Sequence, residues 1–272
     1  MDVQIYNAST IDSLEWPETV DGSYARKCLA SLVKEGISTY IGNVQAHFLA
    51  MKAGNIVLPI VITNGLSENS WVCSSTAQYV GYGLEYTTLI NNPVLSGLVQ
   101  MALKGIGLCA AKSKLDTAIY VNNWLFAVDL YPEGFSEEHI SAITNYCMEN
   151  FPGYALIFRS LNPLLHESLI GSFKNAGFGM MVSRYVHLTD TTDDSIFHTR
   201  IIKSDLKLLR ESSFQVLDQD QIDPSEYPSV LQLYNSLYIT QHSSRNPQIN
   251  EEYMNLLFVS GLLKFKVLKL NN

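Results

Sequence analysis

The sequence predicts an α/β protein of two lobes, in which a mixed central sheet is flanked by helices. Two β-rich runs within residues 46–65 are typical of a hairpin. A strand–helix–strand pattern at residues 154–188 indicates a crossover unit packed on a sheet. Residues 189–195 are polar and acidic, as expected between lobes. The predicted division is a first lobe, a linker and a partial second lobe, at residues 1–190, 191–196 and 197–272.

The first lobe opens with a helix and a hairpin. We expect the helix over residues 22–36, capped by Gly22-Ser23 and ended by Gly36. Gly54-Asn55 is a strong turn signal between the two β-rich runs. Pro59 lies inside the second run, and because proline lacks an N–H group it predicts an edge position or a bulge.

An aromatic segment follows the hairpin. We expect a short strand at residues 71–73 and then a helical pattern, which places Tyr79, Tyr82 and Tyr86 on one face with Glu85 beside them. Two interpretations stay open for this face: a packed aromatic ridge, or the wall of a pocket. In the second, aromatic neighbours would desolvate Glu85 and make it a candidate general base.

Residues 93–112 predict the most apolar helix of the chain. Gln100 and Lys104 make it too mixed to span a bilayer. The first ten residues contain neither a basic region nor an apolar core, so they do not predict a signal peptide. These features lead us to expect a cytoplasmic protein.

The rest of the first lobe alternates strands and helices. Residues 117–130 predict one or two strands broken near Asn122-Asn123. An amphipathic helix over residues 136–150 follows, with His139 at the position where glutamate would complete a capping box. In the crossover unit we expect a strand at 154–158, a helix at 163–176 and a strand at 180–188.

The second lobe is predicted to be mainly helical. Helices are expected over residues 205–212, 224–241 and 249–259, and a last strand over 264–270. That strand is followed by Asn271-Asn272, so we expect its edge to be unpaired unless other material covers it.

Composition narrows the classes of partner. The net charge is −8, and no basic run of five residues occurs. Binding to DNA and docking on an anionic membrane are therefore not expected, because both depend on Lys and Arg. Only 16% of residues are charged, whereas there are 15 tyrosines. This indicates large uncharged surfaces, suited to clefts or partner contacts.

The metal-ligating residue types are scattered along the chain. Neither the four cysteines nor the six histidines show metal-ligand spacing, so no metal is expected and the cysteines are interpreted as reduced, mostly buried thiols. His242 and Arg245 lie in a polar loop that is a candidate for substrate contact. Arg159 and Arg184 lie at opposite ends of the crossover unit, and each predicts either a structural salt bridge or an anion contact.

Three stretches together resemble a known family. They are SWVCSSTAQYVGYGLEY (70–86), YALIFRSLNPLLHESLIGSFKNAGFGMMVSRYVHLTD (154–190) and LYNSLYITQHSSRNPQIN (233–250). They resemble bacterial acyltransferases of the GNAT superfamily (the N-acetyltransferase fold), related to the tandem-GNAT, Fem-type aminoacyltransferases. The resemblance implies one GNAT-like lobe and the opening of a second.

The resemblance also implies a function. It implies acyl or aminoacyl transfer to an amine of a small molecule or peptide, by direct attack on a thioester or ester. The donor would be acetyl-CoA, another acyl donor, an acyl-carrier protein or aminoacyl-tRNA. In this reading the aromatic face lines the acceptor pocket, and an anionic part of a ligand contacts Arg159, Asn162 and Arg184.

One departure from the family pattern favours a different class. GNAT enzymes hold the CoA pyrophosphate on a Gly-rich loop at a helix N-terminus. Here residues 131–135 read YPEGF, with an acidic residue and a single glycine. The alternative to an enzyme is therefore a non-catalytic binding or scaffold module that keeps the fold.

Overall fold

The computed structural model describes residues 1–65, 69–128 and 131–270, and in these ranges the chain is a mixed α/β protein. A five-stranded sheet forms its centre, in the order β1-β2-β3-β4-β5. The strands are antiparallel except for the β4–β5 pair, which is parallel. They are β1 (Val3–Tyr6), β2 (His47–Ala53), β3 (Ile56–Asn64), β4 (Thr117–Val121) and β5 (Ala155–Phe158).

The predicted hairpin is confirmed, but the placement of Pro59 differs from the prediction. β2 and β3 pair around Gly54-Asn55, and Gly54 takes a φ of 58°. β3 is an internal strand, not an edge, because β4 pairs with its other side from Ile60 onward. Pro59 lies just beyond that pairing, where its carbonyl accepts a bond from the N–H of Asn123 over 3.3 Å. Its missing N–H therefore removes no ladder bond.

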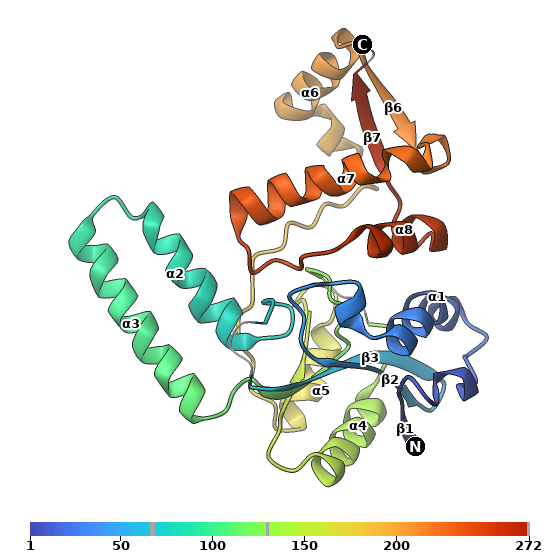
Figure 1. Cartoon of the computed structure of the whole chain (residues 1–272), viewed down its shortest axis with the longest axis vertical. Coiled ribbons are helices and arrows are strands. Elements are labelled where there is room, and N and C mark those ends of the chain that lie inside the picture. The colour runs from blue at the N-terminus through green and yellow to red at the C-terminus, as the bar shows by residue number, and fades with distance from the viewer. Residues whose placement is uncertain (66–68, 129–130, 271–272) are drawn as a thin grey trace.

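Helices cover both faces of this sheet (Figure 1). Helix α1 (Val20–Glu35) packs on one face and ends at Gly36 as predicted. The predicted cap at Gly22-Ser23 is wrong, because the side chain of Thr19 accepts the N–H of Gly22 and caps the helix. Helices α4 (Glu137–Asn150) and α5 (Glu167–Asn175) pack on the other face. Alternate residues of the strands supply the two separate cores.

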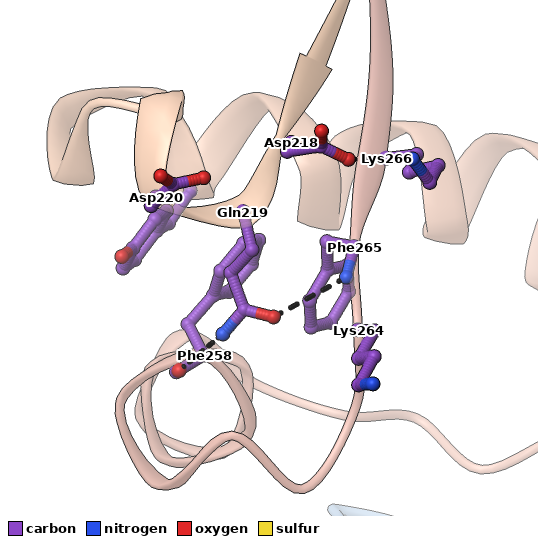
Figure 2. A pocket seen from close by; sticks show the side chains of 8 residues that line it. Asp218, Gln219, Asp220, Phe258, Lys264, Phe265 and Lys266 are labelled. Atoms are coloured by element: carbon purple, nitrogen blue, oxygen red, sulfur yellow. Dashed lines mark hydrogen bonds and ion pairs between the residues drawn. The ribbon is translucent and has the colours of Figure 1, made fainter.

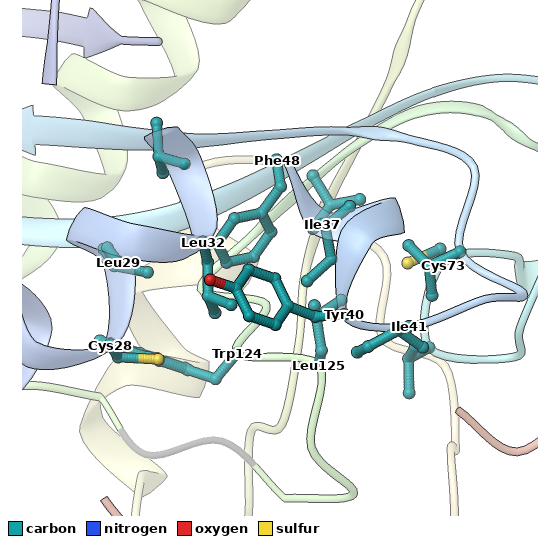
Figure 3. Packing of buried hydrophobic residues seen from close by; sticks show 14 of the residues in the cluster. Cys28, Leu29, Leu32, Ile37, Tyr40, Ile41, Phe48, Cys73, Trp124 and Leu125 are labelled. Atoms are coloured by element: carbon teal, nitrogen blue, oxygen red, sulfur yellow. The ribbon is translucent and has the colours of Figure 1, made fainter. Parts of the chain in front are cut away.

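The core under α1 also receives side chains from the C-terminal lobe. Figure 3 shows part of it, with Leu29 and Leu32 of α1 close to Phe48 of β2 and to Trp124, which lies in the loop after β4. Tyr253 and Leu257 belong to the same cluster. The two lobes therefore share a hydrophobic core.

The C-terminal lobe is a small antiparallel sheet with helices. Its elements are α6 (Arg200–Glu211), β6 (Phe214–Asp218), α7 (Tyr227–Tyr234), a π-helical segment (Asn235–His242), α8 (Glu251–Ser260) and β7 (Lys266–Leu270). The prediction of an unpaired last strand is wrong, because β7 pairs with β6 over its whole length. One face of α8 packs in the first-lobe core, and its Met254 and Phe258 form a third core with Ile222 and Leu231.

Two helical pieces between β3 and β4 form an arm that projects from the body (Figure 1). A π-helical segment (Ala77–Gly81) leads into α2 (Tyr82–Tyr86), and α3 (Pro93–Lys112) returns beside them. Asn92 caps α3, since its side-chain oxygen accepts the N–H groups of Val94 and Leu95. In the described residues α3 is the one helix long and apolar enough to span a membrane by length and composition.

Two predicted strands are absent from the described residues, and so is the optional second strand after Asn122-Asn123, of which residues 129–130 lie outside the described ranges. Residues 71–73 form turns, because the N–H of Trp71 donates to the carbonyl of Arg245 and not to a neighbouring strand. Residues 124–128 also lack a ladder. Residues 180–188 are extended but pair with no strand of the described sheets, and Val182 and Tyr185 face solvent. A strand needs cross-strand pairs to be stable, so β-rich composition alone did not suffice.

Candidate functional site

The candidate site lies where the parallel strands β4 and β5 end. The N–H of Arg159 donates to the carbonyl of Val121 over 3.5 Å, and beyond this bond the strands part. Asn122, one residue past the last paired position of β4, has a φ angle of 57°, and Ser160, two residues past that of β5, has a φ angle of 64°. Left-handed conformations are uncommon outside glycine. In α/β folds, ligands bind beyond the carboxyl ends of parallel strands.

Arg159 is held in place by groups on the adjoining loops. One guanidinium nitrogen (Nη1) donates to Oδ1 of Asn123 over 2.5 Å. The amide of Asn123 in turn donates to the carbonyl of Val72 over 2.7 Å. The carbonyl of Arg159 accepts the hydroxyl of Tyr131 over 2.7 Å. Asn123 is fully buried, so this network fixes both the guanidinium and the backbone of Arg159 at the end of the sheet.

Two arginines lie against Trp71. The guanidinium carbon of Arg184 is 4.1 Å from the ring centroid, and that of Arg159 is 5.5 Å from it. Both distances are within the range of cation–π attraction. Trp71 itself is only 6% exposed. The extended segment 180–188 thus brings Arg184 to the end of β5, and the two predicted arginines meet at one indole ring.

Asn246 joins the C-terminal lobe to this centre. Its side-chain oxygen accepts both the indole N–H of Trp71, over 2.8 Å, and the hydroxyl of Tyr82, over 2.6 Å. Its side-chain nitrogen donates to the carbonyl of Tyr238 over 2.7 Å. Asn43 binds the backbone of the same loop. A buried amide that is fully bonded in this way fixes the loop against the first lobe.

The three tyrosines of the predicted aromatic face surround the same region. Tyr82 stacks on Tyr86 with centroids 6.1 Å apart and meets Trp71 edge-on at 6.5 Å. Beside Tyr79, the side-chain amide of Gln78 donates to the hydroxyl of Ser183 over 2.6 Å. Burial raises the pKa of Tyr79 and of Tyr82, so both phenols stay protonated donors at neutral pH.

Glu85 forms an ion pair with Arg245. The Nε–Oε1 distance is 2.9 Å, and the side chains are 37% and 34% exposed. Arg245 also lies against Gly81, where an added Cβ would come within 2.7 Å of the guanidinium. This contact explains why a glycine stands in the helix. Glu85, predicted as a general base, is the partner of an arginine in this conformation and would act as a base only after the pair opens.

π-Helical segments border the site on two sides. Residues Ala77–Gly81 carry Tyr79, and residues Asn235–His242 carry Tyr238, whose carbonyl holds Asn246. π-Helical turns are rare and occur frequently at functional sites. The two segments come from different lobes, so the site depends on the packing of both.

The remaining predicted site residues lie apart from this cluster or in its second layer. Asn162 caps its own loop, where its side-chain oxygen accepts the N–H of Leu164 over 2.9 Å. His242 ends the second π-helical segment, is exposed and meets the ring of Tyr238 at 6.2 Å. Of these two, neither touches the Trp71 ring.

Three members of the cluster were not predicted from sequence: Trp71, Asn123 and Asn246. Asn123 belongs to the Asn-Asn pair at which we expected the strand to break, and Asn246 to the polar loop containing Arg245. Trp71 was assigned to a short strand. In each case the signal was a polar or aromatic residue at a point where the helical or strand periodicity of the sequence is interrupted. The sequence pattern does not show which of these interrupted segments lie close together in the fold.

The sequence predicts that the N-terminus of α4 lacks the Gly-rich phosphate loop of GNAT enzymes. In the structure, a side chain of α4 itself bonds the backbone at this N-terminus. The Nδ1 atom of His139 accepts the N–H of Ser136 over 3.3 Å, which fulfils the capping role predicted for that position. Gly134 has a φ of 83°, and the N–H of Glu133 donates to Asp21 over 2.8 Å. At the N-terminus of α4, these backbone N–H groups are therefore bonded to side chains of the protein.

A separate hollow of about 680 Å³ lies in the C-terminal lobe, beside β6, β7 and α8 (Figure 2). Phe258 stacks between Tyr227 and Phe265, with both centroid distances at 3.9 Å. The charged groups at its rim are paired in part, since Lys266 binds Asp218 over 2.6 Å. The arginines of the Trp71 cluster are not among its lining residues.

The described part of the chain contains no set of side chains arranged to bind a metal ion. No group of three or more His, Cys, Asp or Glu residues gathers there at a distance suited to a metal ion.

Comparison of the chain with protein-family models, with curated proteins and with solved structures gives no match. The function is therefore argued from the site.

Proposed function

We propose that this chain is an acyl- or aminoacyl-transfer protein of the GNAT type, with its site at the carboxyl ends of β4 and β5. The observation that carries the proposal is the convergence of Arg159 and Arg184 on Trp71 at the point where the two parallel strands part. The sheet is antiparallel up to β4 and parallel at β4–β5, with α4 between these two strands in the chain, and this crossover supports an α/β transfer protein.

The arginines suit an anionic donor. The sequence contains six arginines, and Arg159, Arg184 and Arg245 all lie in this region of an acidic chain. A guanidinium forks onto phosphate or carboxylate oxygens and stacks on aromatic rings at the same time. In the proposed complex, Arg159 and Arg184 contact the anionic part of the donor while Trp71 packs beneath them.

The tyrosine side of the site suits the acceptor. Tyr79 offers a protonated phenol, the ring of Tyr82 supplies an aromatic wall while its hydroxyl donates to Asn246, and Tyr86 extends the aromatic surface outward. The acceptor amine attacks the thioester or ester carbonyl of the donor. A tetrahedral intermediate forms and collapses with loss of the thiol or alcohol, and the amine proton passes to a carboxylate or to water. Glu85 is the nearest candidate carboxylate once Arg245 releases it.

A non-catalytic binding module is the second candidate. It is favoured by the packing of Trp71 and Tyr82, whose polar atoms are both held by Asn246, and by the engagement of Glu85 with Arg245. Such a module would keep the anion contacts and would not use Glu85.

Calorimetric titration with acetyl-CoA and with CoA tests the proposal. Saturable micromolar binding supports acyl transfer, and release of CoA thiol in the presence of a panel of amines then separates the enzyme from the module. Binding without thiol release favours the module. The absence of binding at millimolar ligand removes CoA as the donor.

A further inference from the structure

The outer face of α3 is a broad apolar surface that no other part of the described chain covers. The helix packs inward on the arm through Leu103, which lies against Gly83, and through Gln100, whose amide donates to the Thr87 hydroxyl over 3.0 Å. Its other sides face solvent. The large apolar side chains exposed there are Val94, Leu95, Leu98, Met101, Ile106 and Leu108.

The apolar face of α3 is large enough to bind a partner. A helix of 20 residues is about 30 Å long. Met101 is 70% exposed and Leu108 is 69% exposed, so the apolar surface runs along most of that length. Monomeric proteins rarely expose continuous apolar surfaces of this extent without a partner. Because the arm projects from the body (Figure 1), the face is accessible to a flat partner.

The charge on α3 and the residues that flank it is opposite to that of the rest of the chain. Residues 86–115 contain Lys104, Lys112 and Lys114 and no Asp or Glu. The segment therefore carries +3. The remaining residues carry 15 basic and 26 acidic side chains, which gives −11. All three lysines are exposed.

The distribution of charge favours a lipid surface over a helical protein partner. Helices that pair in water carry charges of both signs beside their apolar seam. On the exposed positions of α3 the charged side chains are Lys104 and Lys112 alone, and the others are apolar or small. An apolar face with lysines beside it, and no acid, is typical of helices that lie in the interface of an anionic membrane.

We propose that the outer face of α3 binds an anionic lipid surface, with the helix lying in the plane of the membrane. Val94, Leu98 and Met101 enter the boundary between headgroups and acyl chains, and Lys104, Lys112 and Lys114 contact lipid phosphates. Lys104 lies near the middle of α3, where a spanning helix would place its charge inside the hydrocarbon, so the helix lies in the interface and does not cross the bilayer. This proposal departs from the expectation of no membrane contact, which rested on the net charge and on the absence of a basic run of five residues. It is independent of the proposed acyl transfer.

Cys109 supplies a probe for the test. It lies on α3 and is exposed, whereas Cys28, Cys73 and Cys147 are buried. A polarity-sensitive fluorophore on Cys109 is titrated with vesicles of phosphatidylcholine, alone or mixed with phosphatidylserine, and sedimentation with vesicles is measured on the unlabelled chain. We expect a blue shift and co-sedimentation with the phosphatidylserine vesicles, both weakened by salt.

Variants separate the two parts of the surface. Replacing Lys104, Lys112 and Lys114 by Gln should weaken partitioning on the order of a hundredfold, from about fivefold per lysine. The double change Leu98→Ser and Met101→Ser should abolish the blue shift. Lys27→Gln, an exposed lysine of α1, is the matched control and should bind as the unaltered chain does.

Three outcomes would overturn the proposal. They are no binding to phosphatidylserine vesicles, equal binding to both kinds of vesicle, and a blue shift that depends on protein concentration without vesicles. In the third case, α3 pairs with a second copy of the chain, and sedimentation equilibrium would show the dimer. Circular dichroism of each variant establishes that the fold is kept.

Discussion

The indole N–H of Trp71 and the side-chain oxygen of Asn246 form a hydrogen bond of 2.8 Å between residues 175 positions apart. The same oxygen accepts the Tyr82 hydroxyl. One amide of the C-terminal lobe therefore fixes two aromatic side chains of the first lobe. The Trp71 cluster is consequently complete only when both lobes are packed together.

Replacing Asn246 by Ala should destabilise the whole chain. The change leaves the buried indole N–H of Trp71 and the hydroxyl of Tyr82 without their acceptor, and a buried unsatisfied donor costs about 1–3 kcal/mol. We expect a loss of about 2–4 kcal/mol in the free energy of unfolding, measured by denaturant titration. Asn145→Ala, on the exposed face of α4, is the control and should change stability little. A loss under about 0.5 kcal/mol for Asn246→Ala would contradict the role of this amide.

The ion pair of Glu85 and Arg245 should contribute little to stability. Both side chains are about one-third exposed, and pairs of this kind are typically worth about 0.2–1 kcal/mol. A double-mutant cycle with Glu85→Gln and Arg245→Gln should give a coupling energy in that range, which falls as salt is added. If Glu85 is the general base, Glu85→Gln should also abolish acyl transfer while stability is kept. Full activity in this variant would remove the assignment.

Thiol reactivity should distinguish one cysteine from three. Burial raises the pKa of Cys28, Cys73 and Cys147 to about 12, so these thiols are protonated and shielded at neutral pH. Cys109 is exposed. A chromogenic disulfide reagent should therefore react rapidly with one thiol in the folded chain and with all four after denaturation. Rapid reaction of a second thiol in the folded state would show that the core opens at that residue.

Stability should fall in mild acid because of two histidines. The Nδ1 atoms of His139 and His166 accept the backbone N–H groups of Ser136 and Asn162. Burial lowers the pKa of each imidazole, and the nearby Glu138 opposes this only in part for His139. A folded pKa below the unfolded value of about 6.5 means that the unfolded chain binds more protons. The contribution is full above about pH 6.5 and is lost as pH falls through the folded pKa.

The measurement is the free energy of unfolding between about pH 8 and about pH 5. His139→Gln keeps an acceptor for the cap, since glutamine at this position completes a capping box, but it does not titrate. The double variant His139→Gln and His166→Gln should show a flatter pH dependence in this range. An unchanged slope would show that other groups cause the acid loss.

The parts of the fold predicted from sequence are those determined by local signals. Gly54-Asn55 specifies the hairpin, and Gly36 ends α1 because it has a φ of 85°. Ser136 and His139 identify the start of α4. The missing strands at residues 71–73 and 180–188 had suitable composition, but no neighbouring strand pairs with them in the described sheets.

The candidate site was predicted residue by residue but not as an arrangement. Tyr79, Tyr82 and Tyr86 share a helical face, which spacing shows. The pairing of Glu85 with Arg245 joins positions 160 apart, and no periodic pattern predicts such a contact. Asn246 was missed for the same reason, because its role depends on how the two lobes pack.

Titration of the Arg184→Ala variant with acetyl-CoA tests the central claim most directly. Arg184 lies on an extended segment outside the sheet, so its loss should leave the fold intact, whereas Arg159 is tied to Asn123. If the two arginines hold the donor, affinity should fall by more than tenfold, with a similar loss in Arg159→Ala, while Arg210→Ala on α6 binds normally. Unchanged affinity in a folded Arg184→Ala variant would contradict the account and place any donor elsewhere.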